Sequence, residues 1–491
     1  MKLTVKNFGP IKSAKVDVKP LTVFVGPSNT GKSYLAMLIY AVAKVMKAPH
    51  EDMIRQLFHE HIDENMVMRA PFLNIFFDEE STKLTDELFL GYLEVIRAHW
   101  RIEAMRCFGE EWRNITKRSG DPASITISDD SGKVVMDFFS SKKDKTLPLD
   151  SMRNNIRNRV SSSSENEDPH QPARLLNLSN FILLEVSKSL DYLPNILRLD
   201  VDYDPTILYR HGGADAHYLP AVRGGIMQSH RILVSTLINN ASSVGLTGTR
   251  IASFNSVIAD FLQKLLMIDR PSYLIDISPR NRREDAYVVS MSSEKIEKEI
   301  MRGKIKMSIL ETGYPDFRYK FTDKGKSRDI SLIHASSSVS ELAPLVLFIR
   351  YYLSPNDIFI VEEPEAHLHP GAQRDVAGIL VELVNAGVNV VITTHSDVIL
   401  EQISNSVHAD QIPKGAILKK RTKARTLNEE KARCYSFKST ATRGKGTVVK
   451  AVQFDDQTGF LTDDHLDVSS DLYNQTVELL NLKVSDENDR A

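Results

Sequence analysis

Short, nearly continuous apolar runs occur at residues 21–25, 358–361 and 388–393. Each run has the length and composition of a strand that is buried on both faces of a sheet. Helical patterns lie beside them, at residues 34–45 after the first run and at residues 346–353 before the second. Strands that are interleaved with helices predict an α/β fold.

The middle and the C-terminal part of the chain carry weaker patterns. No heptad repeat is long enough for a coiled-coil arm, so we expect a compact, mainly helical insertion after the first strand–helix unit. The elements that we predict here are helices at 85–108 and 253–266, strands at 125–127, 133–139, 287–291 and 305–309, and a C-terminal group of strands at 435–437 and 447–454, a turn at 455–459 and a helix at 471–482.

A glycine-rich loop joins the first apolar run to the helical pattern that follows it. The loop consists of Gly26, Pro27, Ser28, Asn29, Thr30, Gly31, Lys32 and Ser33, a complete GxxxxGK[ST] sequence. Between a strand and a helix, the backbone N–H groups of such a loop point at nucleotide phosphates. We expect Lys32 to reach the β- and γ-phosphates and the Ser33 hydroxyl to ligate Mg²⁺.

The second apolar run ends in two consecutive acids, Glu362 and Glu363. In a phosphoryl-transfer site, the first acid after such a strand holds Mg²⁺ directly or through water, and the second orients and polarises the attacking water. We therefore assign Glu362 to the metal and Glu363 to catalysis. His367 and His369 follow without a third ligand nearby in the sequence, so we interpret them as structural or interfacial residues.

The third apolar run is followed by Thr394 and His395. Open α/β sheets bind their ligands at the carboxyl ends of the strands, and a histidine there can hydrogen-bond a γ-phosphate. We predict that His395 senses this phosphate.

Three serines, Ser336, Ser337 and Ser338, stand shortly before the helical pattern at 346–353. Their hydroxyls and the amides at a helix N-terminus would make a second anion-binding end. Taken alone, this cluster indicates only a good helix N-cap.

In this order and combination, the four segments resemble the ABC-type ATPase heads of the SMC, RecF and OLD group, and they are most similar to AAA/OLD-like bacterial ATPases. Residues 26–33 resemble the phosphate loop of that group, residues 362–370 its EEPExHLHP segment and residues 393–397 its TTHS switch. The similarity extends to residues 7–11 near the N-terminus and to residues 218–223, which resemble a YLPAxR segment.

The resemblance implies a P-loop ATPase head with a mainly helical insertion and a small C-terminal α+β extension. It implies that ATP is hydrolysed to ADP and phosphate, and that two heads pair head to tail as a homodimer or a higher homo-oligomer. Each head would complete the ATP site of the other with the three serines at 336–338, which correspond to the signature loop of these ATPases. Ser338 stands where these heads normally carry glycine, so a Cβ and a hydroxyl occupy space that glycine leaves open.

The resemblance also implies a cellular role. ATP-dependent dimerisation would control DNA or a separately encoded effector protein in bacterial anti-phage defence, with DNA repair or maintenance as the alternative. A self-sufficient nuclease is less favoured, because OLD-family nucleases carry a TOPRIM metal site after the ATPase head and the chain after His395 is too short for one. The large insertion and residues 362–370 argue against the energy subunit of a membrane transporter.

The chain length sets the expected domain organisation. At 491 residues the chain exceeds the size that one hydrophobic core fills, so two or three compact units are expected. We assign residues 1–50 to the first part of the ATPase head, 51–200 to the insertion, 201–410 to the second part of the head and 411–491 to the C-terminal extension.

Composition and charge indicate in which cellular compartment the protein works and with which partners. The chain is 42% hydrophobic and 26% charged and contains no apolar stretch long enough to span a bilayer, so we expect a soluble protein without a membrane partner. The N-terminus lacks a signal-peptide core, and two cysteines cannot form a disulfide framework, which favours the cytoplasm. A net charge of −2 gives no overall attraction to nucleic acid, and the basic residues at 419–425 are equally well interpreted as phosphate contacts or as a solvated loop.

Overall fold

The structure is a computed structural model. It describes residues 2–47, 100, 102–109, 117–118, 121–122, 124–128, 134–137, 215–230, 232, 254–268, 284–310, 315–412, 425–439, 446–461, 470–471 and 473–480.

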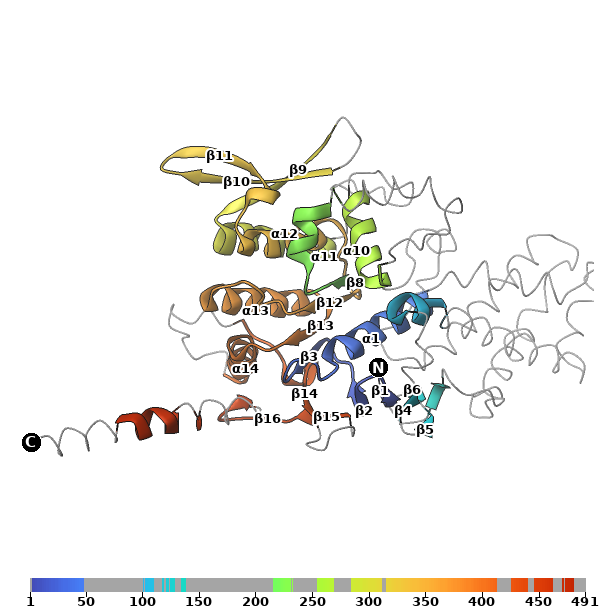
Figure 1. The fold of residues 1–491 in the computed structure, drawn as a ribbon. Coiled ribbons are helices and arrows are strands. Elements are labelled where there is room, and N and C mark those ends of the chain that lie inside the picture. Colours follow the sequence, from blue (N-terminus) through green and yellow to red (C-terminus); the bar gives the residue numbers. More distant parts are fainter. Residues whose placement is uncertain are drawn as a thin grey trace, which may run out of the picture.

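A ten-stranded mixed sheet runs through the molecule in the order β7-β6-β1-β2-β15-β14-β3-β13-β12-β8 (Figure 1). The strands β14, β3, β13, β12 and β8 are parallel neighbours, whereas the pairs β6–β7, β1–β6, β1–β2 and β14–β15 are antiparallel. The strand bounds are β1 Lys2–Phe8, β2 Ile11–Asp17, β3 Leu21–Val25, β6 Ser124–Ser128, β7 Val134–Asp137, β8 Ala216–Leu219, β12 Ile358–Glu362, β13 Asn389–Thr394, β14 Ala432–Ser439 and β15 Thr447–Val452.

Helices cover both faces of this sheet, and the alternation of side chains along the buried strands explains how. Phe24 and Ile360 point to a core that they share with α1 (Lys32–Lys47). Val25 and Phe359, one position away on the same strands, point to the opposite core. That second core contains α12 (Ser337–Tyr351), α13 (Pro370–Asn385) and α14 (Asp397–Gln411). A central strand with two buried faces explains the uninterrupted apolar sequence of β3.

Smaller elements extend the second core. The antiparallel sheet β9-β10-β11 lies beside α11 and α12 at one end of the molecule (Figure 1). Its inner residues Ile305, Phe317 and Tyr319 are buried in the second core. The remaining bounds are α10 Ser256–Met267, α11 Glu284–Lys295, η4 Ile296–Met301, β9 Gly303–Ile309, β10 Pro315–Asp323, β11 Lys326–Ser331, η5 Leu332–His334, η6 Glu429–Lys431, β4 Lys117–Arg118, β5 Asp121–Pro122, β16 Phe454–Asp455 and β17 Gly459–Phe460. Residues 100, 102–108, 223–230, 470–471 and 473–480 are also helical.

A buried ionic cluster anchors the second half of α1. Asp260 of α10 accepts hydrogen bonds from Tyr40 Oη at 2.9 Å, from Lys44 Nζ at 2.6 Å and from Arg106 Nη2 at 2.7 Å. Two cations and a hydroxyl compensate the buried carboxylate, and its pKa is lowered because these hydrogen bonds and charges outweigh the effect of burial. The cluster joins α1, α10 and the helix at 102–108. It therefore fixes the position of α1, which begins in the glycine-rich loop at residues 26–33, hereafter the P-loop.

The α/β fold that the sequence predicts is confirmed, and the three apolar runs form β3, β12 and β13. The predicted strand at 287–291 is wrong, because these residues lie in α11, a helix that packs against α12. The C-terminal segment, expected as a small α+β extension after residue 410, contributes β14 and β15 to the central sheet itself. Residues 51–99, 138–200 and 419–424 lie outside the described part.

No helix in the part of the chain that the structure describes is long and apolar enough to cross a membrane.

Candidate nucleotide-binding site

Three loops meet at the carboxyl edge of the central sheet. The last residue of β3 is level with the last residue of β13, and the last residue of β12 is level with the penultimate residue of β13. Gly26, His395 and Glu363 are the next residues along these three strands. The sheet therefore brings the P-loop, the histidine and the acidic segment, which we define as residues 362–370, side by side, although the sequence separates the first from the other two.

The P-loop backbone has the shape that its glycines permit. Gly26 has φ +139° and Gly31 has φ +98°, values that residues with a Cβ rarely adopt. A Cβ on Gly26 would lie 2.8 Å from Phe437 O of β14, and one on Gly31 would lie 2.7 Å from Pro10 Cγ. The loop is thus pressed against the strands behind it, while Pro27, Ser28 and Asn29 at its tip are exposed.

A hydrogen bond within the P-loop stabilises this shape, and the loop leads directly into a helix. The Thr30 hydroxyl donates a hydrogen bond to Pro27 O at 2.8 Å. Helix α1 starts at Lys32, so the amides of its first turn follow the glycine turn directly. This combination of an open loop tip and a helix start fits the phosphates of a nucleotide.

Lys32 lies at the centre of the site and is only 6% exposed. Its Nζ donates to Gly26 O at 2.7 Å and to Pro27 O at 2.8 Å, which holds the ammonium inside the loop. Burial lowers its pKa to about 8, and the negative charges of Glu363 and Glu365 oppose this shift. Glu363 and Glu365 on the segment after β12 thus lie close enough to Lys32 to act on its pKa, in agreement with the alignment of the strand ends.

Glu362 and Glu363 point in different directions although they are adjacent. Glu362 ends β12 in a buried position, and its Oε2 accepts a hydrogen bond from Ala221 N at 3.0 Å. Glu363 has a positive φ of 42°, and its N–H donates to Thr393 O at 2.8 Å. Its side chain is 40% exposed, with Oε1 3.6 Å from His395 Nε2. The second acid is therefore the one that faces solvent beside the predicted phosphate sensor.

Glu365 is a site residue that the sequence analysis did not single out. Its Oε1 accepts hydrogen bonds from Thr394 Oγ1 at 2.8 Å and from His395 N at 2.7 Å. Burial raises the pKa of Glu365, while these two donors act in the opposite direction. Glu365 thereby connects the acidic segment to the end of β13. Its position two residues after the adjacent acids Glu362 and Glu363 was the available signal in the sequence.

The two histidines of the acidic segment have separate local roles. His369 is the N-cap of α13, where its Nδ1 accepts a hydrogen bond from Gly371 N at 3.2 Å. His367 is exposed and has a positive φ of 56°. Within the described residues, no group of three or more His, Cys, Asp or Glu side chains could hold a metal ion by itself.

A magnesium ion nevertheless fits this donor set, because Mg²⁺ in phosphoryl-transfer sites is bound by one or two protein oxygens together with substrate phosphates. Ser33 lies exposed in the first turn of α1. Glu362 ends the strand that lies two places from β3 and has one carboxylate oxygen besides the one bonded to Ala221. The hydroxyl of Ser33 and the carboxylate of Glu362 are the groups that would hold the ion.

The three serines form the start of α12. Ser336 is the N-cap residue, and its Oγ lies 3.1 Å from Ser338 Oγ. Ser336 and Ser337 are exposed, whereas Ser338 is half-buried. Their hydroxyls are thus accessible at a helix N-terminus.

Residues 218–223 are the segment whose importance the sequence revealed only through resemblance. Strand β8 pairs with β12 in parallel, so the residues after β8 pass directly beside Glu362. Arg223 is buried here and donates to backbone carbonyls of both Glu362 and Glu363.

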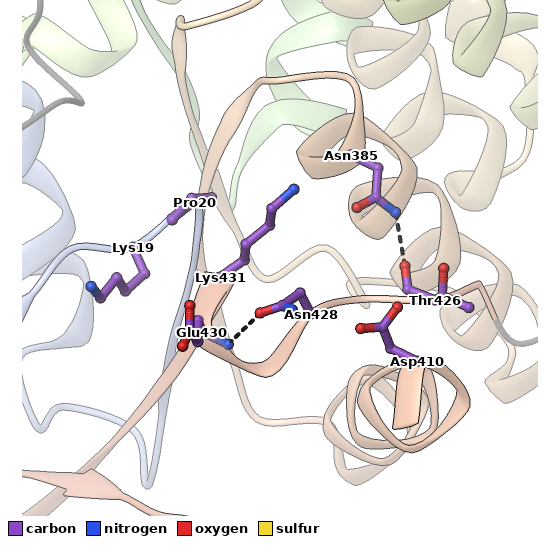
Figure 2. A pocket seen from close by; sticks show the side chains of 8 residues that line it. All are labelled: Lys19, Pro20, Asn385, Asp410, Thr426, Asn428, Glu430 and Lys431. Carbon is purple, nitrogen blue, oxygen red and sulfur yellow. Dashed lines mark hydrogen bonds between the residues drawn. The ribbon is translucent and has the colours of Figure 1, made fainter. Parts of the chain in front are cut away.

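A polar surface pocket lies at the opposite edge of the sheet and is distinct from this site. Figure 2 shows its lining, in which Lys19 and Pro20 precede β3 whereas the P-loop follows β3. Asn385 and Thr426 close one side through a hydrogen bond of 2.8 Å from Nδ2 to the backbone oxygen. The complete lining is Lys19, Pro20, Asn385, Asp410, Thr426, Asn428, Glu430 and Lys431.

Comparisons with solved structures give matches of low overall similarity. The SMC head domain from Thermotoga maritima is 12% identical, with 92% of this chain and 98% of that chain covered and a TM-score of 0.32. The Smc head domain with an extended coiled coil bound to the C-terminal domain of ScpA, derived from Pyrococcus furiosus, is 12% identical, with coverage of 96% and 98% and a TM-score of 0.34.

No curated protein sequence matches the chain significantly. A family match covers most of it, because residues 1–400 match the AAA ATPase domain family. This range contains the P-loop, the serines at the start of α12, the acidic segment and His395. The match confirms the ATPase domain that the motifs predict. The chain belongs to the AAA ATPase domain family.

Proposed function

We propose that this protein binds ATP with Mg²⁺ between the P-loop and the acidic segment and hydrolyses it to ADP and phosphate. The observation that carries the proposal is the position of buried Lys32, which lies within electrostatic reach of Glu363 and Glu365 at the carboxyl edge of the sheet. A buried ammonium held by two loop carbonyls is suited to an anionic ligand, because phosphate oxygens can compensate its charge.

Each site residue has a role in this proposal. Residues 28–31 of the loop supply backbone N–H groups to the phosphates, and Lys32 binds the β- and γ-phosphate oxygens. Ser33 and Glu362 hold Mg²⁺, which when bound neutralises charge on the phosphates. Glu363 orients the attacking water and accepts its proton, since its carboxylate is accessible and its backbone is fixed. His395 hydrogen-bonds the γ-phosphate beside that carboxylate.

The proposal extends to assembly. Ser336 and Ser337 are exposed at the start of α12, where a second copy of the chain can present its nucleotide to them. A homodimer or higher homo-oligomer with ATP between the heads would close when ATP binds and open after hydrolysis, because the γ-phosphate contacts exist only in the closed pair. Ser338 is half-buried, so its side chain limits how closely the partner nucleotide approaches.

We propose that this cycle, in the cytoplasm, controls a separately encoded effector protein or DNA in anti-phage defence, with DNA repair as the second candidate. The motif resemblance supports this part. Affinity capture from native cells with Glu363→Gln in the presence of ATP tests it, and we expect a bound effector protein or nucleic acid. If neither an effector protein nor nucleic acid is recovered, the proposed role is contradicted. Metal-dependent DNA cleavage by the purified chain alone would favour a nuclease instead.

Calorimetric titration of ATP with Mg²⁺ tests the binding site. We expect one ATP per chain for the natural protein and at least a tenfold weaker affinity for Lys32→Ala, since a charge-assisted contact to phosphate is lost. Lys12→Ala is the matched control, because Lys12 is an exposed lysine of β2. No uptake of ATP by the natural protein, or equal affinity for Lys32→Ala, would contradict the proposal.

A further inference from the structure

Arg223 occupies a buried position between the acidic segment and α12. It follows the end of β8 and starts the helix at 223–230, and it is only 2% exposed. Because β8 and β12 are parallel neighbours, this residue lies beside the carboxyl end of the strand that carries the acids. A fully buried guanidinium requires several acceptors.

The guanidinium finds these acceptors on two different elements. Nη1 donates to Glu362 O at 2.5 Å, and Nη2 donates to Glu363 O at 3.0 Å. On its other side, Nε lies 3.3 Å from Glu341 O and 3.2 Å from Glu341 Oε2. The planar fork thus joins the two acids of the site to α12 through one rigid group.

The bond to Glu363 O acts on an unusual backbone conformation. Glu363 has a positive φ of 42°, which is unfavourable for a residue with a Cβ and persists only where the surroundings hold it. Its N–H is fixed by Thr393 O at 2.8 Å, and its carbonyl is fixed by Arg223 Nη2 and by Ala366 N at 3.0 Å. The direction of the Glu363 side chain therefore depends on Arg223.

Contacts on the α12 side are equally tight. A Cβ on Gly224 would collide with Glu341 Oε1, so the two helices approach closely at this point. Gln228 Nε2 donates to Ser340 Oγ at 3.1 Å one turn further along the helix at 223–230. Glu341 and Ser340 belong to the first turns of α12, the helix that begins with the exposed serines.

We propose that Arg223 is a positioning residue that holds Glu363 in its hydrolytic orientation and couples this orientation to α12 through Glu341. A shift of the start of α12, where a partner's nucleotide would bind, moves Glu341 and so moves the guanidinium that holds the Glu363 carbonyl. This inference rests on the proposed ATP hydrolysis. It adds a buried residue that acts on the rate of the chemical step through the backbone of Glu363.

The test compares Arg223→Lys and Glu341→Gln with the natural protein in ATP affinity and in kcat. Lysine keeps the charge but cannot donate to both carbonyls and to Glu341 in one plane. We expect kcat to fall about 10- to 100-fold in each variant, since a misplaced catalytic group costs a factor of this size, while the dissociation constant of ATP changes less than about threefold. The double variant should be no slower than the slower single variant, because both changes break one link.

Arg350→Lys is the matched control. Arg350 also lies on α12 and binds a buried acid, with Nη2 2.8 Å from Glu297 Oε2, but it faces β9 and η4 at the far end of the helix. We expect a lower melting temperature and an unchanged kcat for this variant. It separates a general loss of stability from loss of the link to Glu363.

The outcomes distinguish the inference from the proposed function. Normal turnover by the natural protein together with kcat within twofold of it for Arg223→Lys and Glu341→Gln would overturn the inference alone. Equal losses of ATP affinity and kcat in both variants would also overturn it, because they indicate a disturbed binding site. Absence of turnover in the natural protein would overturn the proposed function and the inference with it.

Discussion

Glu363 Oε1 lies 3.6 Å from His395 Nε2, across the ends of the neighbouring strands β12 and β13. Both side chains are partly exposed, but both backbones are fixed. The Glu363 N–H donates to Thr393 O at 2.8 Å, and the His395 N–H donates to Glu365 Oε1 at 2.7 Å. The side chains of Glu363 and His395 thus meet at one accessible point next to the P-loop.

This geometry predicts that His395→Ala slows turnover more than it weakens binding. Loss of one donor at the reacting phosphate is expected to lower kcat about 100-fold, while ATP affinity changes less than about threefold. Steady-state kinetics and calorimetry measure the two quantities. His369→Ala serves as the control, since His369 only caps α13 and its loss should leave kcat unchanged. A loss of affinity as large as the loss of kcat would place His395 in binding instead.

The lowered pKa of Lys32 predicts a pH dependence of ATP binding. Without nucleotide, Lys32 loses its proton as the pH rises through about 8, whereas bound phosphate favours the charged form. The apparent affinity should be constant below this pH and weaken by about tenfold per pH unit above it. Titrations between pH 7 and pH 9.5 check this expectation, and a flat profile would contradict the buried position of Lys32.

The same shift has a consequence for stability. The pKa of Lys32 is lower in the folded protein than its ordinary value of 10.5, so the unfolded chain binds more protons between about pH 8 and that value. The contribution of Lys32 to the free energy of unfolding is therefore unfavourable below about pH 8 and is relieved as the pH rises. Lys32→Met should make the nucleotide-free protein more stable at pH 7, as measured by denaturant unfolding, and a less stable variant would contradict this.

Gly31→Ala should reduce both stability and ATP binding. Alanine at this position would have an unfavourable φ of +98°, and its Cβ would lie 2.7 Å from Pro10 Cγ. The β1–β2 turn or the P-loop therefore has to move. The strained φ alone costs about 1–2 kcal/mol of unfolding free energy. Gly325→Ala is the control, because it shares a positive φ of 77° but has nothing within 4 Å of the added Cβ. Gly325→Ala should lose stability and keep full ATP affinity, and equal ATP affinity for both variants would contradict the tight fit of the loop.

Mixing two inactive variants tests the shared active site. Lys32→Ala removes the P-loop lysine, and Ser337→Arg blocks the start of α12. If two chains share each site, a mixed dimer keeps one intact site, and an equal mixture should recover about a quarter of the natural turnover. Recovery should depend on protein concentration. A mixture that stays as inactive as its components would contradict the head-to-tail arrangement.

Much of this site could be predicted from the sequence because its parts are local. The P-loop, the acids after β12 and His395 each follow a short apolar strand, and the sheet rule that places ligands at the carboxyl ends of parallel strands brings them together. The conformations of Gly26 and Gly31 also follow from the residue types that the loop requires.

The contacts that hold these parts in place could not be predicted in the same way. Arg223 and Glu341 are far apart in the sequence, and neither belongs to a pattern with a period of a helix or a strand. Their pairing depends on β8 lying beside β12, and this strand order joins segments that are far apart in the sequence. The error at 287–291 has a similar cause, because packing of α11 against α12 overrides the local preference of Val288 and Val289 for a strand.

The rate of ATP hydrolysis by Glu363→Gln tests the central claim most directly. Glutamine keeps the size of the side chain but cannot accept the proton of the attacking water. The account predicts that kcat falls at least about 100-fold while ATP affinity is retained, and that the variant accumulates as a closed dimer in ATP and Mg²⁺. A rate equal to that of the natural protein would contradict the assignment of Glu363 as the catalytic residue and, with it, the proposed site.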